Sequence, residues 1–592
     1  MYCYFRSRKY LTTVCVGVLL LSGALESKAD TLLIQNATLL DMIGDAPIRN
    51  ASVLISDDTI ESIWSENEQP NNLSPDTTVI DASGKVLLPA FIDSHVHYNW
   101  YMGELFLAHG ITTVNDHSSR IYWQAATRKG LNTGGLRGPR YLFCARIGGE
   151  SASDNTALAQ LRLFATASRP NEVRQAISAI RANADCVRQN PETPEELFRA
   201  ITREANLAGL SVIAHSFDAR HSAEIGLNGI EHLEGVALAT IRSPEGLRAI
   251  ADMKLEQGHK HPLLYQWMEE RYYDDVINAL LEKNVYLNPT LIHEWKGVID
   301  RTRQFEQDDN YLFAHPSLQY IPMDEKLVSQ GQYHWADLAM LDVIDEEQIF
   351  VNNSYFIPAK GLKEKLDKGY ANIQMFLRRF VDAGGKLYSG TDTAASSMPG
   401  ISLHHEMQLL VDAGVSEMNT LASSTRWAAE FLRIDDRLGT VETGKIADLV
   451  ILDANPLDNI ANTRRVSHVI MAGKIVDTEY HADYSFPFHQ YGPVGKHLYH
   501  RQPIIADVQP VMAIQATETA LKITGENFMP ETVAVFNGEV VSTKYISRTE
   551  LAVDLNSVQT SQPGSYVISV QTPAPGGGMA EPVEFIVDYQ EL

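Results

Sequence analysis

Residues 86–97 read VLLPAFIDSHVH. The run is apolar as far as Ile92 and predicts a buried strand over Val86–Asp93, with His95 and His97 directly after it. Side chains two residues apart on an extended strand lie on the same face, so both imidazoles can point to one place. Because imidazole nitrogens are common ligands of divalent metal ions, the stretch predicts a buried strand that ends at a metal site.

Seven further strand candidates follow, and helical stretches separate most of them. They are Ile111–Asn115, Arg140–Ala145, Ala184–Arg188, Ser211–His215, Gly229–His232, Val285–Pro289 and Lys386–Ser389. Alternation of strands and helices favours a parallel sheet, and eight strand–helix units close naturally into a (β/α)8 TIM barrel. The span 233–385 is longer than two such units need, which predicts an inserted helical segment.

The regions on both sides of this α/β region are rich in short strands. Segments 30–90 and 437–478 predict one small β-sandwich, assembled from both sides of a barrel at 91–436. Residues 479–505, rich in Tyr, His and Pro, predict a linker. Short strands at the spacing of a sandwich then predict a separate Ig-like domain over 506–592. The fold class expected is therefore α/β, with two additional β-domains.

Three more candidate ligands lie at the ends of predicted strands. His215 ends the fifth strand, His232 ends the sixth, and Asp392 follows the eighth. In a TIM barrel the carboxyl ends of the strands all face the functional end, so these side chains converge there with the first two histidines. We therefore expect a metal site with the ligands His95, His97, His215, His232 and Asp392. The alternative is a set of histidines with separate structural roles.

Six stretches carry a family resemblance: Leu88–His97, His109–Val114, Ile230–His232, Ser389–Asp392, Leu403–Leu410 and Leu438–Val450. Together they resemble the amidohydrolase superfamily, and in particular its imidazolonepropionase-like and prolidase-like branches. The resemblance covers about Thr31–Asp477. It implies a barrel enzyme that uses a divalent cation, zinc in the first place, to activate a water molecule.

The resemblance also implies roles for individual residues. Asp392 would accept the proton of the water and pass it to the leaving nitrogen, while His232 would polarise the substrate carbonyl or bind a metal ion. Binuclear prolidase-like members carry a carboxylated lysine on the fourth strand, where this chain has Arg188. A guanidinium stays protonated, cannot carry a carbamate and repels a second cation. We therefore favour one ion over two. The ligands of a single ion would be His95, His97, His215 and Asp392, with His232 acting on the substrate.

The reaction expected is hydrolysis of a C–N bond in a small substrate, such as a dipeptide, an N-acyl amino acid or a related amide. One alternative is a deaminase or cyclic-amide hydrolase. The other is a catalytically silent envelope protein, in which the barrel is a scaffold and the Ig-like domain binds a partner. Barrels of this kind often pair, so a homo-oligomer is a further expectation.

Other polar residues near the predicted strand ends favour ordinary structural roles. Asp218 is expected to cap a helix or to be solvated rather than to shuttle protons, and His117 to be a satisfied surface histidine. His404 and His405 are expected on the helix after the eighth strand, away from the metal. Tyr388 is expected to contribute to packing.

The chain has a formal net charge of −25 and no compact block of Lys and Arg. Such a surface repels phosphate backbones and anionic lipid, which argues against a nucleic-acid partner. The first 29 residues combine Arg6, Arg8 and Lys9 with an apolar run and Ser27-Lys28-Ala29. This pattern is typical of a secretory signal, and an uncleaved anchor is the alternative. We expect a periplasmic or secreted protein with no membrane span in the mature chain.

Only two of the four cysteines lie beyond the predicted signal, Cys144 and Cys186. Each falls within a strand that is predicted to be buried. Two cysteines do not make a disulfide framework, so buried free thiols are expected.

The C-terminal domain carries a second resemblance. Leu521–Phe528 and Pro563–Val570 resemble strands and turns of the IPT/TIG Ig-like family. The resemblance covers about Pro510–Asp588 and implies a binding or spacer role, with a protein or a glycan as the partner.

Overall fold

The computed structural model describes residues 31–589 except 66–72, 74, 119–120, 148–166, 168, 190–192, 217, 253–261, 298, 324, 328, 331–332, 334–348, 352–354, 358–360, 394–396, 483, 485–501 and 574–577. The predicted signal at 1–29 and residues 485–501 of the predicted linker lie outside the described residues. Within the described ranges, no helix has the length and apolar character that a membrane span requires.

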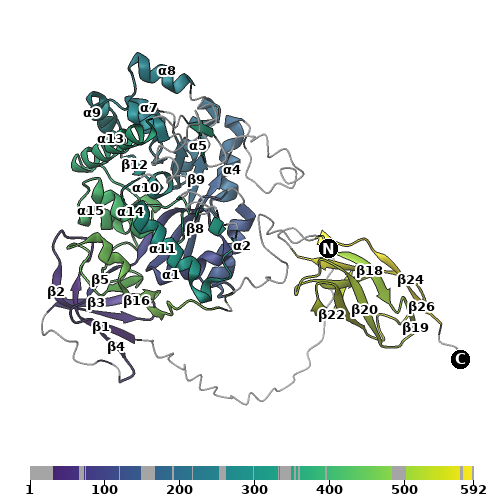
Figure 1. Ribbon diagram of the computed structural model, residues 1–592. Coiled ribbons are helices and arrows are strands. Elements are labelled where there is room, and N and C mark those ends of the chain that lie inside the picture. Colours follow the sequence, from purple (N-terminus) through teal and green to yellow (C-terminus); the bar gives the residue numbers. More distant parts are fainter. Residues whose placement is uncertain are drawn as a thin grey trace, which may run out of the picture.

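Seven parallel strands form one sheet in which neighbours in sequence are also neighbours in space. Helices surround these strands (Figure 1), as in a TIM barrel, which confirms the predicted fold class. The strands are β6 (Phe91–Val96), β7 (Ile111–Asp116), β8 (Arg140–Arg146), β9 (Cys186–Gln189), β10 (Ser211–His215), β11 (Gly229–Glu231) and β12 (Tyr286–Asn288).

Segment 386–393 closes the eighth side of the barrel through isolated parallel bridges. Leu387 bridges to β12 and Thr393 bridges to β6. Between them the backbone of Asp392 adopts a left-handed φ of 51°, which interrupts the extended conformation that a continuous ladder needs. Within the predicted strand Lys386–Ser389 only Leu387 forms a bridge, and Thr393 completes the ring beyond Asp392.

The predicted first strand, Val86–Asp93, consists of two strands in different sheets. β5 (Val86–Pro89) pairs with strands outside the barrel, and β6 pairs with β7. At Ala90 the backbone N–H donates to the carbonyl of Asp448 (3.0 Å), and one residue later it donates to Gly110 of the barrel (2.9 Å). The chain changes sheets at this point, and a continuous apolar run does not reveal such a change.

β5 belongs to a second sheet whose strands come from both sides of the barrel sequence. The order is β17-β16-β15-β5-β1-β2-β3, with β4 beside β1. This sheet has a hydrophobic core of its own, which includes Ile34, Val53 and Leu449. Its other strands are β1 (Thr31–Leu39), β2 (Ile48–Ser56), β3 (Thr59–Ser65), β4 (Thr78–Asp81), β15 (Leu449–Leu452), β16 (Val466–Met471) and β17 (Lys474–Val476).

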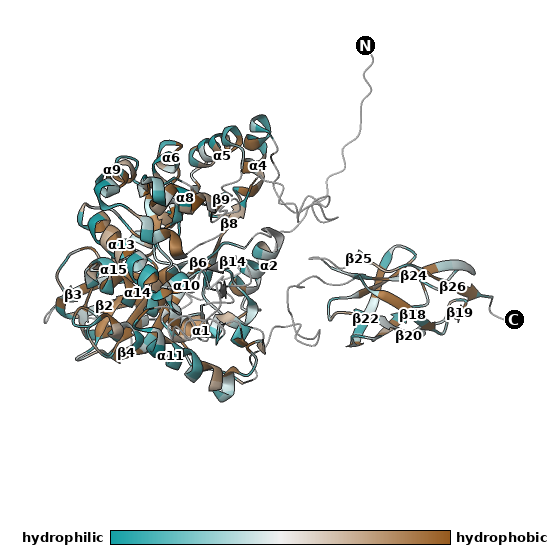
Figure 2. Ribbon diagram, turned by 45° about the horizontal axis from the view of Figure 1, so that its top comes forward, coloured by the Kyte–Doolittle hydropathy of each residue, from teal (hydrophilic) through white to brown (hydrophobic). Residues whose placement is uncertain are grey.

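The helices around the barrel are mostly amphipathic. In Figure 2 both hydrophobic and hydrophilic residues occur on α5, α9 and α13, as expected for helices with one face on a core. Much of the described part of the span 233–385 is helical. The helices are α1 (Gly103–Ala108), α2 (Ile121–Asn132), α4 (Val173–Ile180), α5 (Glu195–Leu207), α6 (Ala219–Glu224), α7 (Glu234–Thr240), α8 (Pro244–Asp252), α9 (Tyr273–Glu282), α10 (Leu291–Trp295), α11 (Thr302–Ala314), α13 (Leu362–Asp382), α14 (Ile401–Asp412), α15 (Glu417–Ser423) and α16 (Arg426–Leu432).

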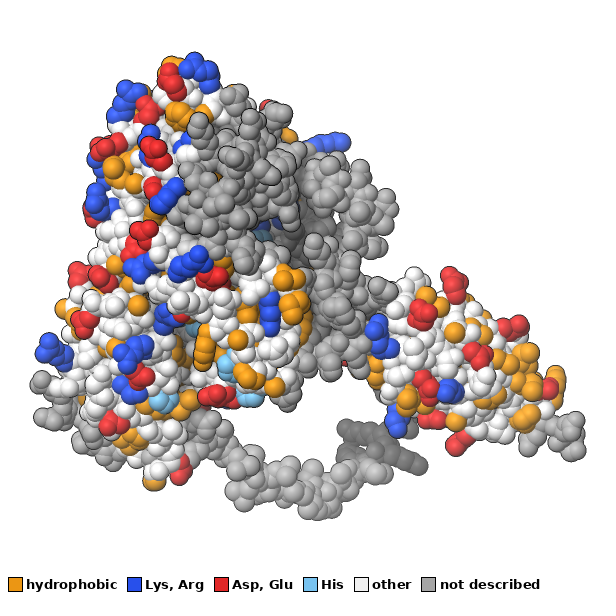
Figure 3. All heavy atoms as spheres, viewed as in Figure 1, with side chains coloured by type: hydrophobic (Ala, Val, Ile, Leu, Met, Phe, Trp, Pro, Cys, Tyr) orange, Lys and Arg blue, Asp and Glu red, His pale blue; other side chains and the backbone are white. Residues whose placement is uncertain are grey.

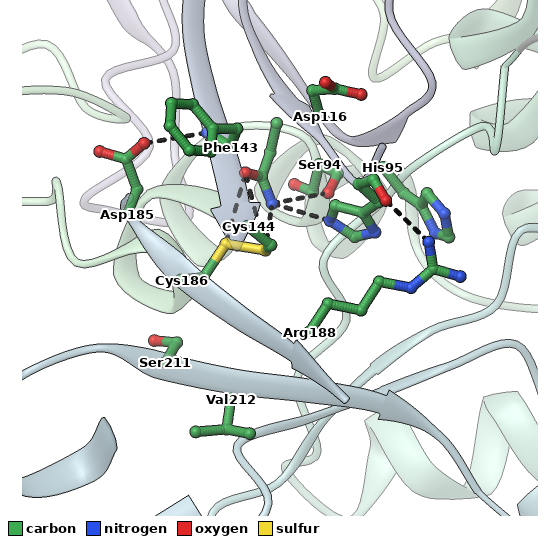
Figure 4. The surroundings of a disulfide bond; sticks show 12 residues. Ser94, His95, Asp116, Phe143, Cys144, Asp185, Cys186, Arg188, Ser211 and Val212 are labelled. Atoms are coloured by element: carbon green, nitrogen blue, oxygen red, sulfur yellow. Dashed lines mark hydrogen bonds between the residues drawn. A yellow bond between two sulfur atoms is a disulfide. The ribbon is translucent and has the colours of Figure 1, made fainter. Parts of the chain in front are cut away.

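Cys144 of β8 and Cys186 of β9 lie opposite each other in register and form a disulfide bond (Figure 4). The prediction of free thiols is wrong. The two cysteines are 42 residues apart in sequence and meet only because their strands pair. The side chain of Asn115, on the next strand β7, contacts the sulfur of Cys144 at 3.5 Å.

The C-terminal residues form a separate β-rich domain with its own hydrophobic core, which includes Ile523, Leu551 and Phe585. Its strands lie in a nine-stranded sheet, and its membership in the IPT/TIG family stays a prediction. The strands are β18 (Ile504–Gln509), β19 (Met512–Ile514), β20 (Thr519–Glu526), β21 (Val533–Phe536), β22 (Glu539–Ser547), β23 (Glu550–Leu555), β24 (Gly564–Thr572), β25 (Gly578–Met579) and β26 (Val583–Asp588).

Acidic and basic side chains are intermixed over the face of the whole molecule that Figure 3 shows.

Candidate active site

The carboxylate of Asp392 lies at the centre of the candidate site. Its Oδ1 atom is 3.2 Å from Nε2 of His95 and 3.0 Å from Nε2 of His97. The preceding residue, Thr391, donates both its backbone N–H and its hydroxyl to the buried carboxylate of Asp93 (3.1 and 2.8 Å). These bonds join segment 386–393 to β6, and they hold Asp392 against the two histidines.

His232 lies near the other oxygen of the same carboxylate. Its Nε2 atom lies 3.6 Å from Oδ2 of Asp392, and its Nδ1 atom is hydrogen-bonded to the hydroxyl of Thr290. Both His232 and Asp392 have left-handed backbones, with φ of 59° and 51°. Such conformations cost roughly 1–3 kcal/mol in residues other than glycine and cluster at functional sites. The strain here turns two strand ends toward one point.

A buried carboxylate behind the site orients His95. Oε2 of Glu231 lies 2.5 Å from Nδ1 of His95, and Glu231 also accepts hydrogen bonds from Tyr388 (2.7 Å) and Asn288 (3.0 Å). Burial by itself lowers the pKa of His95, but the charges of Glu231 and Asp392 outweigh burial and raise the pKa to about 9. The sequence interpretation missed Glu231, although its place beside His232 at a strand end was a usable signal.

The side chains at this point fit a divalent metal ion. Ligand atoms of His95, His232 and Asp392 all lie within 4.8 Å of one another, and all three residues are buried. Nε2 of His95 is buried and makes no hydrogen bond among the described residues. Imidazole nitrogens and a carboxylate oxygen are the donor set that zinc and similar ions prefer, so these residues could hold such an ion.

His215 is placed differently from the other four predicted ligands. Its Nε2 atom lies 3.1 Å from Nη2 of Arg188, and because a guanidinium can only donate, this nitrogen accepts the bond. The ring of His215 lies 4.7 Å from that of His232, measured between centroids. The structure therefore brings His215 beside the group around Asp392, with its Nε2 atom directed to the arginine.

Comparison with known proteins identifies the family. A model of the amidohydrolase family matches residues 86–476. The chain belongs to this family. Its members act on C–N bonds as hydrolases or deaminases and usually bind a divalent metal.

Individual relatives of this amidohydrolase are distant. The chain is 23% identical to 5'-deoxyadenosine deaminase of Methanobrevibacter smithii over 458 residues, which cover 75% of this chain and 88% of the deaminase. Among solved structures, a Xaa-Pro dipeptidase with bound methionine has a TM-score of 0.51 at 19% identity, covering 76% of this chain and 100% of the dipeptidase. Molinate hydrolase has a TM-score of 0.51 at 18% identity, covering 76% and 95%. At these identities the two structures indicate a shared fold.

Two further histidines lie at the site of this amidohydrolase. His117 is buried, and its ring centroid is 4.0 Å from that of His95, so the prediction of a surface histidine is wrong. Burial and the neighbouring charge of His95 hold the pKa of His117 well below its usual value. His293 on α10 places Nδ1 3.5 Å from Oδ2 of Asp392. Its position shortly after a predicted strand end was a signal that the sequence interpretation did not use.

The remaining singled-out residues have structural contacts. Asp218 caps α6 by accepting from the backbone of Arg220 (2.9 Å), as expected. His404 and His405 lie buried on α14. Tyr388 is buried, as predicted, but it also donates its hydroxyl hydrogen bond to Glu231 and therefore supports the site indirectly.

Proposed function

We propose that this amidohydrolase is a metal-dependent hydrolase that cleaves the amide or peptide-like bond of a small substrate. The observation that supports the proposal is the Asp392 carboxylate, which lies 3.0–3.6 Å from nitrogens of three histidines at the carboxyl end of the barrel. A proton acceptor among possible metal ligands is what amide hydrolysis by activated water requires.

The proposed ligands of the ion are His95, His97 and Asp392, with His232 beside them. When bound, a divalent cation such as zinc lowers the pKa of water and polarises a carbonyl group. Glu231 holds Nδ1 of His95, so that Nε2 faces the site. We assign His215 to Arg188 rather than to an ion, and we propose one ion per chain.

Asp392 and His232 carry out the proton and charge chemistry in this proposal. Asp392 takes a proton from the attacking water and delivers it to the leaving nitrogen, so that the amide bond breaks to an acid and an amine. His232, whose Nδ1 is bonded to Thr290, presents Nε2 to the carbonyl oxygen on which negative charge develops. His293 approaches the same Asp392 oxygen and borders the space for the substrate.

A second candidate function is deamination of an aminated heterocycle. The alignment with the archaeal deaminase covers 88% of that protein, which is the observation in its favour. A deaminase would use the same Asp392 and His232, but ammonia would leave in place of an amine.

We also propose that the protein is exported to the periplasm or secreted. The N-terminal signal pattern supports export, and so does the Cys144–Cys186 disulfide, because disulfides persist in oxidising compartments. Sequencing the N-terminus of the protein isolated from its native cells tests this: we expect a start at residue 30, and an intact Met1 in cytoplasmic extract would refute it.

The proposed reaction is tested by mass spectrometry of the purified protein with pooled dipeptides, N-acyl amino acids and aminated heterocycles. We expect addition of water with splitting of an amide, lost with a chelator and restored by zinc. Exchange of an amine for oxygen identifies a deaminase instead. If a zinc-loaded sample converts no compound in any of the three pools, both functions are contradicted and the role of a binding protein is supported.

A further inference from the structure

Arg188 stands at the end of β9 beside the candidate metal site. Its side chain extends from the strand in Figure 4, where a dashed line marks a hydrogen bond from the guanidinium. This bond goes from Nη1 to the backbone carbonyl of His117 (2.8 Å), and Nη2 donates to Nε2 of His215 (3.1 Å). Two neutral acceptors therefore hold the guanidinium in one orientation.

The guanidinium of Arg188 has no carboxylate partner within 4.0 Å among the described residues, and its Nε atom is buried without a hydrogen bond there. Lys296 and Arg140, two other buried or half-buried cations, differ in this respect. Lys296 lies 3.2 Å from Asp309, and Arg140 lies 3.2 Å from Asp448. Because burial removes a charge from water, a half-buried cation without a counter-ion is unfavourable unless a ligand supplies the negative charge.

The position of Arg188 relates it directly to the reacting bond. Nη2 of Arg188 lies 3.1 Å from Nε2 of His215, and the ring centroid of His215 lies 4.7 Å from that of His232. Arg188 therefore contacts a histidine that neighbours His232, the residue proposed to face the carbonyl oxygen. A planar guanidinium matches a carboxylate through two parallel N–H···O bonds, which a point-like ammonium cannot reproduce.

We propose that Arg188 binds a carboxylate of the substrate next to the scissile amide. The substrate class is then N-acyl amino acids, including dipeptides, whose carboxylate is separated from the amide nitrogen by one carbon. This inference rests on the proposed hydrolase function and narrows it. His215 is a positioning residue for Arg188. Its Nε2 atom fixes one edge of the guanidinium, and the remaining N–H groups donate hydrogen bonds to the carboxylate.

Binding of non-cleavable probes to the full-length protein tests carboxylate binding by Arg188 without measuring enzymatic activity. The probes are N-methanesulfonyl derivatives of L-alanine, L-leucine, L-proline and L-phenylalanine, each as the free acid and as the neutral carboxamide. By isothermal titration calorimetry we expect at least one acid to bind tenfold or more tightly than its carboxamide. A smaller ratio for every pair, or no binding of any acid, overturns the proposal.

Three variants assign the preference to Arg188. Arg188→Gln is expected to weaken binding of the preferred acid at least tenfold and to leave the carboxamide unchanged. Arg188→Lys, which keeps the charge but loses the planar fork, should show a smaller loss. The matched control is Arg220→Gln, because Arg220 is already paired with Asp218 at 3.2 Å, and this variant should keep the wild-type ratio. An unchanged ratio in folded Arg188→Gln overturns the proposal, and circular dichroism establishes that each variant is folded.

The outcomes separate this inference from the proposed function. If the protein prefers the acids but hydrolyses no acyl compound, carboxylate binding by Arg188 is supported and the proposed hydrolase function is refuted. If it hydrolyses amides without preferring the acids, the hydrolase function is supported and carboxylate binding by Arg188 is refuted.

Discussion

His95 and His232, at the carboxyl ends of β6 and β11, differ in their surroundings from a second pair of histidines, His404 on α14 and His109, which contacts it. At the strand ends, nitrogens of His95 and His232 face the carboxylate of Asp392. On α14, Nε2 of His404 lies 3.0 Å from the carbonyl of His109, and Nδ1 lies 2.9 Å from the hydroxyl of Thr463. Nitrogens of the first pair face a shared carboxylate, whereas His109 and His404 have neutral hydrogen-bond partners.

The two groups also differ in charge. Burial lowers the pKa of His109 to about 4 and that of His404 well below its usual value. His95 is equally buried, but Glu231 and Asp392 raise its pKa to about 9. Neighbouring carboxylates therefore distinguish His95 from His109 and His404.

The largest expected effect comes from removing the shared carboxylate. Asp392→Asn keeps the size of the side chain but loses its charge and basicity, and we expect kcat to fall by roughly 10³-fold or more. The rate is measured on the substrate found in the screen, with thermal unfolding as the control for folding. Wild-type activity in Asp392→Asn would refute the proposed mechanism.

Glu231→Gln tests whether the carboxylate behind His95 matters to the ion. The variant keeps the shape but removes the charge that orients Nδ1, and such changes typically weaken metal binding about 10–100-fold. Zinc affinity is measured by competition with a chromogenic chelator. An unchanged affinity would mean that Glu231 only fills space.

His404→Phe makes the corresponding change in the second group. It leaves the carbonyl of His109 without its partner, and an unsatisfied buried acceptor costs about 1–3 kcal/mol. We expect the free energy of unfolding in urea to fall by about that amount, with zinc affinity unchanged. A loss of zinc affinity without a loss of stability would contradict the separation of the two groups.

The smallest effect is a difference in pH dependence between the groups, measured on chelator-treated protein. The pKa of His109 is lowered from 6.5 to about 4 on folding, so its contribution to stability is lost as the pH falls from about 6.5 toward 4. The pKa of His95 is raised from 6.5 to about 9, so its contribution is lost as the pH rises through about 9.

Urea unfolding between pH 5 and pH 9.5 measures both slopes. His109→Gln should flatten the acid side of the profile, and His95→Asn should flatten the alkaline side. The same change of slope in both variants would show that the two groups do not titrate independently.

The sequence was sufficient for the barrel and for the main candidates of the site. Strand-like apolar runs end at His95, His215 and His232, and this pattern needs only local information about burial and spacing. The barrel then predicts that strand ends converge. Glu231 and His293 were open to the same reasoning, because they stand at or just after strand ends, but their roles depend on which neighbour each one meets.

The tertiary structure alone decided the contacts between residues that are far apart in sequence. It joined Cys144 to Cys186, buried His117 against His95, and directed His215 to Arg188. Periodicity reports which face of a strand is buried, but it carries no information about which strand lies beside it. The types and spacing of the candidate ligands could therefore be predicted from the sequence, whereas the pairing of each side chain, and with it the pKa shifts of His95 and His117, depended on the closed barrel.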